Sequence, residues 1–273
     1  MHFLDGLSND IKKNLLEELR VLWTHTSTSI EGNTLSLGET AFVLSEGLTI
    51  KGKPLKDHRD IQGHARAVDL IMNLLGKEHY VEQDLFDLHR LVINEQILDV
   101  FKPVGDWKKE NNSTSVTIGD LQTIVEFSNF WDVPSLMARW LDLLNTEINE
   151  MKEPDDMMRS YARLHLSFVS IHPFYDGNGR IARLVSNLPC LKAGFPPVII
   201  EKEKRFEYVS SIAHYQFKNG VPASETAIIH EDTAFEEFLV LCRQGWEKAL
   251  GLVNQAHELQ KARDENISRS PGE

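Results

Sequence analysis

The fold of this chain is decided by one run of twelve residues, His172-Pro173-Phe174-Tyr175-Asp176-Gly177-Asn178-Gly179-Arg180-Ile181-Ala182-Arg183. A buried helix is expected to end just before this run, because Pro173 disfavours the helical conformation of the residue that precedes it. A new helix is expected to begin near Gly179, since the apolar residues from Ile181 to Leu188 are spaced for one buried face. The run therefore predicts a helix, a loop with two glycines and a second helix.

The loop has the composition of an anion site. Glycines ahead of a helix leave backbone amides free and pointed at one place, and the helix dipole favours negative charge there. Arg180 and Arg183 are three positions apart on the first turn and add two cations beside these amides. The pattern predicts a site for phosphate groups.

Two further side chains could supply chemistry. Asp176 lies in the same loop, and a lone carboxylate among phosphate-binding groups is a typical Mg²⁺ ligand. His172 stands at the loop entrance, and an imidazole with an ordinary pKa of about 6.5 can take up a proton. Each feature alone is more often a turn, a structural histidine or a solvated face. Their combination in one loop indicates phosphoryl or nucleotidyl transfer.

Helical periodicity dominates the rest of the chain, so the predicted fold class is mainly α. Ser36 and Glu39 form a predicted capping box, and Gly47 is a predicted helix stop. Two alternating segments around Gly119-Asp120 predict one β-hairpin. The predicted strands are Ser115–Ile118 and Thr123–Phe127, and the predicted helices include Asp57–Leu75, Glu82–Leu98, Pro134–Met151, Pro154–Ile171 and a late helix spanning Phe235 to Leu250.

Composition sets bounds on function. The chain has 29 Lys plus Arg and 41 Asp plus Glu, and its net charge of −12 disfavours bulk binding to nucleic acid. No apolar run approaches the roughly 18 residues of a membrane span, and Met1–Asp10 lacks the features of a secretory signal. Cys190 and Cys242 form no metal or disulfide framework and suit a reducing compartment. These features predict a cytoplasmic location without membrane contact.

The run resembles the signature of the Fic family, His-x-Phe-x-(Asp or Glu)-Gly-Asn-Gly-Arg-x-x-Arg, and fills every fixed position. The resemblance extends over roughly Thr24 to Tyr208. Gly105-Asp106-Trp107, leading to Val116-Thr117-Ile118, stands where Fic proteins have a flap hairpin. There Trp107-Lys108 replaces the more usual aromatic-Arg pair. The resemblance implies a Fic-type helical core with one β-hairpin flap and flanking N- and C-terminal helices.

This resemblance also implies how the chain is divided. Residues 1–76 would be N-terminal helices that include an inhibitory segment, and residues 77–200 would form the catalytic core. Residues 201–273 would be C-terminal helices and a polar tail, frayed from Asp264 onward.

The activity implied by the resemblance is protein adenylyltransferase, which moves AMP from ATP onto a protein hydroxyl. His172 would be the general base for a Ser, Thr or Tyr hydroxyl of the target, and the target can be the chain itself. Asp176 would bind the Mg²⁺ that bridges the α and β phosphates. Phe174 would be a core anchor without a chemical role.

The same resemblance assigns the phosphate contacts. Gly177, Asn178 and Gly179 would form the anion hole, with Asn178 at the α phosphate. Arg180 and Arg183 would hold the β and γ phosphates. Attack at the α phosphorus would leave AMP on the target and release pyrophosphate.

A second pattern lies at Ser27-Thr28-Ser29-Ile30-Glu31-Gly32-Asn33. Ser27 and Glu31 are four positions apart, on one helix face, and Gly32 would end the helix in the left-handed conformation. The segment is similar to the family's inhibitory motif, (Ser or Thr)-x-x-x-Glu-(Gly or Asn). This implies that Glu31 pairs with Arg183 and deprives the γ phosphate of its partner, while Ser27 orients or caps the helix.

Other functions remain open at this point. The same site could transfer another nucleotide or phosphocholine, or remove AMP from a modified protein with Glu31 positioning a water. A non-catalytic regulator is a third alternative, and the complete signature argues against it. Nucleic acid is not expected as a partner, because Lys202, Lys204 and Arg205 form only a small basic cluster, typical of a solvated face. The late aromatic stripe is expected to pack in the core, and its pairing with a second copy in a homodimer stays open.

Overall fold

The computed structural model describes residues 1–273 except 1, 95–98, 100–101, 119–120, 150–152 and 270–273. The described chain is mainly α with a two-stranded antiparallel hairpin, which confirms the predicted fold class. Its elements are α1 Asn9–Ile30, α2 Leu37–Glu46, α3 Leu55–Leu74, α4 Glu82–Ile93, β1 Ser113–Ile118, β2 Leu121–Glu126, α5 Val133–Asn149, α6 Pro154–Ile171, α7 Asn178–Val185, α8 Leu188–Lys192, α9 Arg205–Asn219 and α10 Thr233–Arg269.

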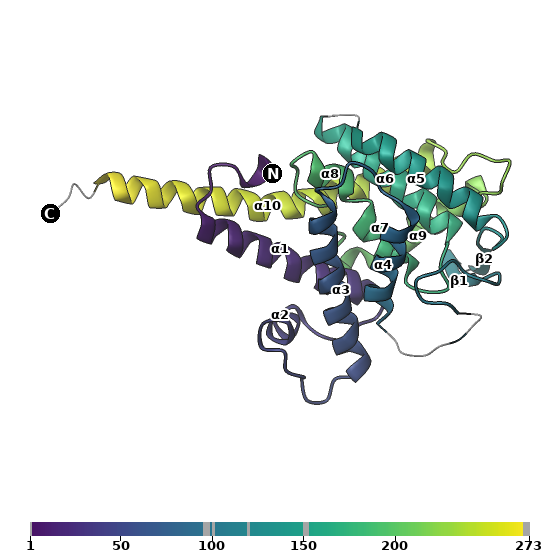
Figure 1. The fold of residues 1–273 in the computed structure, drawn as a ribbon, viewed down its shortest axis with the longest axis horizontal. Helices are drawn as coiled ribbons and strands as arrows, with labels where there is room; N and C mark the ends of the chain where they lie inside the picture. The colour runs from purple at the N-terminus through teal and green to yellow at the C-terminus, as the bar shows by residue number, and fades with distance from the viewer. Residues whose placement is uncertain (1, 95–98, 100–101, 119–120, 150–152, 270–273) are drawn as a thin grey trace.

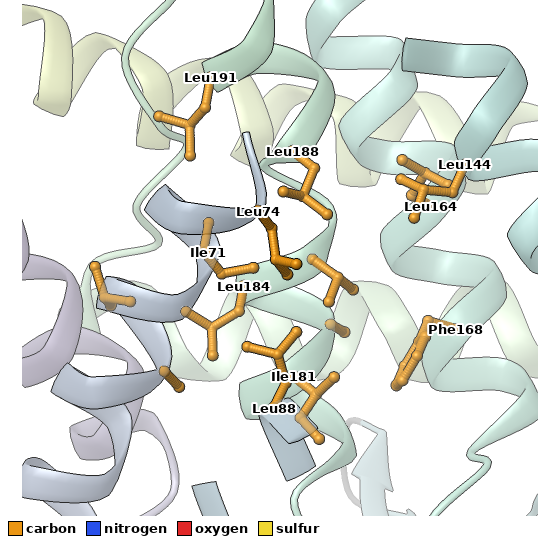
Figure 2. Close-up of a cluster of buried hydrophobic side chains, with 14 of the residues drawn as sticks. Ile71, Leu74, Leu88, Leu144, Leu164, Phe168, Ile181, Leu184, Leu188 and Leu191 are labelled. Carbon is orange, nitrogen blue, oxygen red and sulfur yellow. The ribbon is translucent and has the colours of Figure 1, made fainter. Parts of the chain in front are cut away.

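The helix that follows the signature loop lies at the centre of the core. Ile181 and Leu184 of α7 are fully buried, and neighbouring helices surround them. Burial of one such side chain contributes roughly 1.5–3 kcal/mol, so α7 is held firmly from several sides. Figure 2 shows the side chains that converge there: Ile71 and Leu74 of α3, Leu88 of α4, Leu144 of α5, Leu164 and Phe168 of α6, and Leu188 and Leu191 of α8.

Helix α6 ends where the sequence predicts. Its last helical residue is Ile171, and His172 takes the left-handed conformation with φ 53° and ψ 60°. Pro173 excludes the right-handed helical conformation at His172, which explains the sharp turn. His172, the candidate base, thus has a left-handed backbone conformation, which is uncommon for residues other than glycine.

Helix α1 changes character along its length. Its first part buries an apolar face that includes Leu15, Leu19 and Trp23. Its last part buries the polar run 24–28, in which the hydroxyls of Thr26 and Thr28 donate to carbonyls one turn earlier. The apolar part anchors α1 on the core, and the polar part brings its C-terminal end to the signature loop.

Helix α10 is longer than the sequence suggests. The prediction that the chain is frayed from Asp264 onward is wrong for residues 264–269, because α10 continues to Arg269. Residues 270–273 lie outside the described part. Arg263 holds this end by donating to both carboxylate oxygens of Asp10 at 2.8 and 2.9 Å, so the middle of α10 runs alongside α1 and its last turns project beyond the start of α1 (Figure 1). Of the described helices, neither α10 nor any other has the length and apolarity to cross a membrane.

The predicted late stripe belongs to the core. Phe235, Phe238, Leu239 and Cys242 of α10 are fully buried, in agreement with the expectation of core packing. Pairing with a second copy stays a prediction.

The hairpin is present with slightly different bounds. Its strands begin at Ser113 and Leu121, two residues earlier than predicted in each case, and Ser115 pairs with Ile124. The predicted turn Gly119-Asp120 lies outside the described residues. Helix α4 was predicted to reach Leu98, but the described helix ends at Ile93 and residues 95–98 lie outside the description.

Candidate active site

A cleft of about 470 Å³ opens over the signature loop. The loop forms its floor, β1 and α9 form two sides, and the C-terminal end of α1 closes another. The residues that line it include Glu31, His172, Asp176, Gly177, Asn178, Gly179, Arg183 and Tyr208. The structure therefore gathers most of the residues that the sequence singled out.

The loop is held in shape by the side chain of Asn178. Its Oδ1 accepts from the Phe174 amide and its Nδ2 donates to the Phe174 carbonyl, both at 2.9 Å. Both ends of this side chain are thus used within the loop. The backbone amide of Asn178 is one of the first-turn amides of α7 that have no intrahelical acceptor, so it can donate to a phosphate in the cleft.

Gly177 is favoured by its positive φ, and the ends of flexible side chains lie close to both loop glycines. Gly177 has φ 78°, and a Cβ there would lie 2.9 Å from Cδ1 of Ile93. A Cβ on Gly179 would lie 2.8 Å from Oε1 of Glu31 and 3.1 Å from Nη1 of Arg183. The absence of side chains therefore lets the end of α1 reach the first turn of α7.

His172 is held in one orientation. Its Nδ1 lies 3.3 Å from the Val169 carbonyl, which assigns the proton to Nδ1 and leaves the lone pair on Nε2. The ring of Phe127 stacks on the imidazole with centroids 3.6 Å apart and planes 9° from parallel. Burial, with the Lys108 ammonium adding to it, lowers the pKa of His172 to about 3. The imidazole is therefore neutral at physiological pH and able to accept a proton.

Asp176 has the exposure that a cation ligand needs. Its side chain is 72% exposed, and its Oδ1 accepts from the Gly177 amide at 2.6 Å. The described residues contain no cluster of three acidic, histidine or cysteine side chains that could hold a metal. A cation here would take one carboxylate from the protein and its other ligands from phosphates and water, and Mg²⁺ commonly binds in this way.

The backbone of Asp176 is fixed from behind by His89, which sequence reasoning missed. The ring of His89 stacks on Phe174 with centroids 3.9 Å apart. Its Nδ1 accepts from the Gly105 amide at 2.8 Å, so Nε2 carries the proton and donates to the Asp176 carbonyl at 3.2 Å. Phe174 itself is fully buried, as expected of a core anchor.

Arg180 lies on the other side of the loop. Among the described residues that line the cleft, Arg180 is absent. Its guanidinium lies 3.4 Å from Asp60, 3.3 Å from the Val92 carbonyl and 3.7 Å from Asp176. In this structure Arg180 braces α3 and α4 against the loop, and its contact with a phosphate stays a prediction.

Arg183 is the most enclosed charge of the site. It is 2% exposed, and its Nε and Nη2 donate to Oγ and O of Ser27 at 3.0 and 2.9 Å. Nη2 also donates to Oε1 of Glu31 at 2.6 Å, and Nη1 donates to the Tyr208 hydroxyl at 2.9 Å. Burial opposes the charge, but Tyr208 and Glu31 outweigh it and raise the pKa of Arg183. The contact between Glu31 and Arg183 that the sequence implies is present, and Ser27 touches Arg183 directly.

Helix α9 contributes Tyr208, which sequence reasoning missed, and Arg205, which the sequence assigned to a solvated face and the structure places at the cleft. The Tyr208 hydroxyl, which accepts from Arg183, lies 2.9 Å from Nε2 of His165. Burial first, and then the charge of Arg183, lower the pKa of His165. Because the Tyr208 oxygen already accepts from Arg183, its proton is assigned to Nε2 of the neutral imidazole. Arg205 donates to the Ile30 carbonyl at 2.6 Å and ties the end of α1 to α9. These residues follow the signature by more than twenty positions and form no local motif with it.

Comparison with known proteins agrees with this geometry. The model of the Fic/DOC family matches residues 80–190. The protein adenylyltransferase fic-1 of Caenorhabditis briggsae is 34% identical over 231 residues, which are 83% of this chain and 43% of that protein. The protein adenylyltransferase Fic of Culex quinquefasciatus is 33% identical over 213 residues, which are 76% of this chain and 38% of that protein.

The chain belongs to the Fic/DOC family. It spans less than half the length of these curated relatives.

Solved structures give the same fold. A Fic-domain signalling protein of Bacteroides thetaiotaomicron superposes with a TM-score of 0.78 at 23% identity, over 95% of this chain and 93% of that one. Fic-1 of C. elegans, residues 134–508, superposes with a TM-score of 0.71 at 25% identity, over 96% of this chain and 69% of that one. The family match begins at residue 80 and ends at residue 190. Glu31 precedes this range and Tyr208 follows it, so both line the cleft from outside the matched region.

The bond between Tyr208 and Arg183 can be tested by the stability of two tyrosine variants. Tyr208→Phe leaves a buried guanidinium donor and Nε2 of His165 without a partner, so it should lower the free energy of unfolding by about 1–3 kcal/mol. Tyr161 is the matched control, because its buried hydroxyl has no hydrogen-bond partner among the described residues. Tyr161→Phe should leave stability unchanged or raise it. Urea unfolding measures both, and equal losses would contradict the assignment.

Proposed function

We propose that this chain is a protein adenylyltransferase that moves AMP from ATP onto a hydroxyl side chain of a target protein. The observation that carries the proposal is the convergence of four groups on one cleft. These are the Nε2 lone pair of His172, the carboxylate of Asp176, the first-turn amides of α7 and the guanidinium of Arg183. The names of the relatives support the same activity.

The transfer follows from the roles of these groups. Nε2 of His172 takes the proton of the target hydroxyl while the oxygen attacks the α phosphorus. A new bond forms between that oxygen and the α phosphorus, and the bond to the bridging oxygen of the β phosphate breaks. The electron pair leaves with pyrophosphate, AMP stays on the target, and the proton stays on His172. The negative charge of bound triphosphate raises the pKa of the imidazole and makes it a stronger base.

The phosphates have two sets of binding groups. The first-turn amides, at Asn178, Gly179 and Arg180, suit the α phosphate because the helix dipole favours negative charge there. Arg183 suits the γ phosphate. Asp176 would hold Mg²⁺, which supplies charge neutralisation across the α and β phosphates.

The cleft walls suit the remaining parts of the substrates. Val209, Ile212 and Ala213 of α9 offer an apolar wall to the nucleotide base. The target is expected to lie along the hairpin as an added strand, because β1 borders the cleft and pairs with β2 on one side.

We further propose that Glu31 inhibits the transfer. Its carboxylate occupies Nη2 of Arg183, so a γ phosphate there would lose a donor and meet a like charge. ATP could still bind in a pose that is not aligned for attack. Removal of AMP is the second candidate, because the Glu31 side chain remains 42% exposed in the cleft and could position a water.

Intact-mass measurement tests the activity. The protein incubated with Mg²⁺ and each nucleoside triphosphate should gain the mass of one AMP with ATP. His172→Ala should lower this labelling by roughly 10²–10⁴-fold, because the hydroxyl proton loses its acceptor. Calorimetry on the same preparation should show nearly unchanged ATP affinity. His79→Ala, at an exposed position, is the control. Full labelling by His172→Ala would contradict the assigned base.

The role of Glu31 is tested by rate. Glu31→Gln keeps the size and removes the charge, whereas Glu31→Gly removes the whole side chain at the C-cap of α1. Both should raise self-labelling, by about 5- to 150-fold if alignment limits the rate. The lower end is expected, because solvent screens a half-exposed carboxylate.

Two further variants complete that test. Glu18→Gln, on an exposed turn of the same helix, should leave the rate unchanged. In an Arg183→Ala background neither Glu31 change should restore much activity. Unchanged rates in both Glu31 variants would overturn the inhibitory role and favour the water-positioning role in AMP removal.

A further inference from the structure

Lys108 carries a buried ammonium close to the candidate base. Its side chain is 1% exposed, although lysine is among the residues least often found fully buried. Within the described part of the chain its Nζ has no acidic partner and donates to Oδ1 of Asn112 at 2.8 Å. Burial lowers the pKa of Lys108 to about 8. A buried cation lowers the stability of the fold unless strong contacts compensate for the lost hydration. The contacts of Lys108 therefore indicate why the charge is kept there.

Asn112 passes the contact on to the signature loop. Its Nδ2 donates to the carbonyls of Phe174 and Tyr175 at 3.2 and 3.4 Å. The backbone amide of Lys108 donates to the Pro173 carbonyl at 2.9 Å. Three consecutive carbonyls after His172 are therefore bound by the segment that leads into β1.

The other end of the hairpin meets the same place. The Phe127 amide, directly after β2, donates to the Asn112 carbonyl at 3.3 Å. Nζ of Lys108 lies 6.0 Å from the centroid of the Phe127 ring. The same ring stacks on the imidazole of His172. Both ends of the hairpin, the loop carbonyls and the ring of His172 thus meet around Lys108 and Asn112.

We propose that Lys108 and Asn112 form a pair of positioning residues that holds the hairpin base against the signature loop and thereby sets the place of the His172 ring for transfer. Lys108 acts without touching substrate, because it is enclosed and is not among the described residues that line the cleft, whereas Asn112 lies at the cleft wall. This inference rests on the proposed transfer and assigns a new role within it.

The charges around His172 agree with this placement. Burial and the Lys108 ammonium both lower the pKa of His172, whereas Asp176 and the bond to Val169 oppose them. On the α9 side, Gln216 lines the cleft and brings no charge. Lys108 is the cation that adds to burial in lowering the pKa of the imidazole.

The test compares neighbouring lysines. Lys108→Met removes the ammonium and the bond to Asn112. Lys109→Met is the matched control, since Lys109 is half-exposed and pairs with Asp106 on the surface. Lys108→Arg restores a cation with hydrogen-bond donors. Saturating rate and KM for ATP are measured by self-labelling with ATP labelled at the α position.

Lys108→Met should lower the saturating rate by roughly 10- to 100-fold, because a shift of about 1 Å in a reacting group has effects of this size. The KM for ATP should change by less than about threefold, since the phosphate-binding groups stay in place. Lys108→Arg should recover much of the rate, and Lys109→Met should match wild type. A wild-type rate in Lys108→Met, or a KM that rises as much as the rate falls, would overturn the positioning role.

Amide hydrogen exchange separates this inference from the proposed function. Residues 105–112 and 172–178 should exchange at least about tenfold faster in Lys108→Met than in wild type or Lys109→Met, because Asn112 loses its bond to Lys108 and the bonds between the two segments are weakened. If the wild-type protein transfers no AMP, the proposed function fails and exchange still decides whether the pair holds the loop. Unchanged exchange in both segments would overturn the inference whatever the activity.

Discussion

The buried guanidinium of Arg183 is the constraint on which the rest of the structure depends. A charge removed from water requires hydrogen-bond partners in fixed places. Ser27 and Glu31 come from α1, 156 and 152 positions away, and Tyr208 comes from α9. Because all of these partners contact one side chain of α7, the C-terminal end of α1 and helix α9 pack on two sides of the signature loop. The cleft is the space that remains between them.

This arrangement gives Arg183 two kinds of partner. Ser27 and Tyr208 hold Nε, Nη2 and Nη1 from enclosed positions, whereas Glu31 reaches Nη2 from the cleft side and remains half-exposed. Loss of Glu31 would therefore leave the guanidinium in place and free one donor direction. The buried polar run at the end of α1 makes hydrogen bonds within the helix that do not depend on Glu31. In the proposed mechanism, a γ phosphate and Glu31 would compete for Nη2 of Arg183.

The features of this fold that depend only on residues close in the sequence were predicted from the sequence. Pro173 places the end of α6 at Ile171, and the capping box at Ser36 and Glu39 is present as predicted. Arg180 and Arg183 look alike in the sequence, but only the contacts of α7 with α1 on one side and with α3 and α4 on the other separate their directions.

Other features depend on contacts between distant segments. Tyr208 gains its place through such a contact, so no spacing in the sequence could have identified it. The sequence marked Lys108 only as a departure from the family's aromatic-Arg pair, and its contact with Asn112 comes from the structure. The same holds for the end of α10, which Asp10 stabilises across 253 positions.

The central claim, that Glu31 and the γ phosphate share Arg183, is tested most directly by calorimetry of ATP and AMP binding to wild type and Glu31→Gln with Mg²⁺. The account predicts that Glu31→Gln tightens ATP binding by roughly fivefold or more and leaves AMP binding unchanged, because AMP lacks the phosphate that meets Arg183. Equal changes for ATP and AMP, or no change for either, would contradict it.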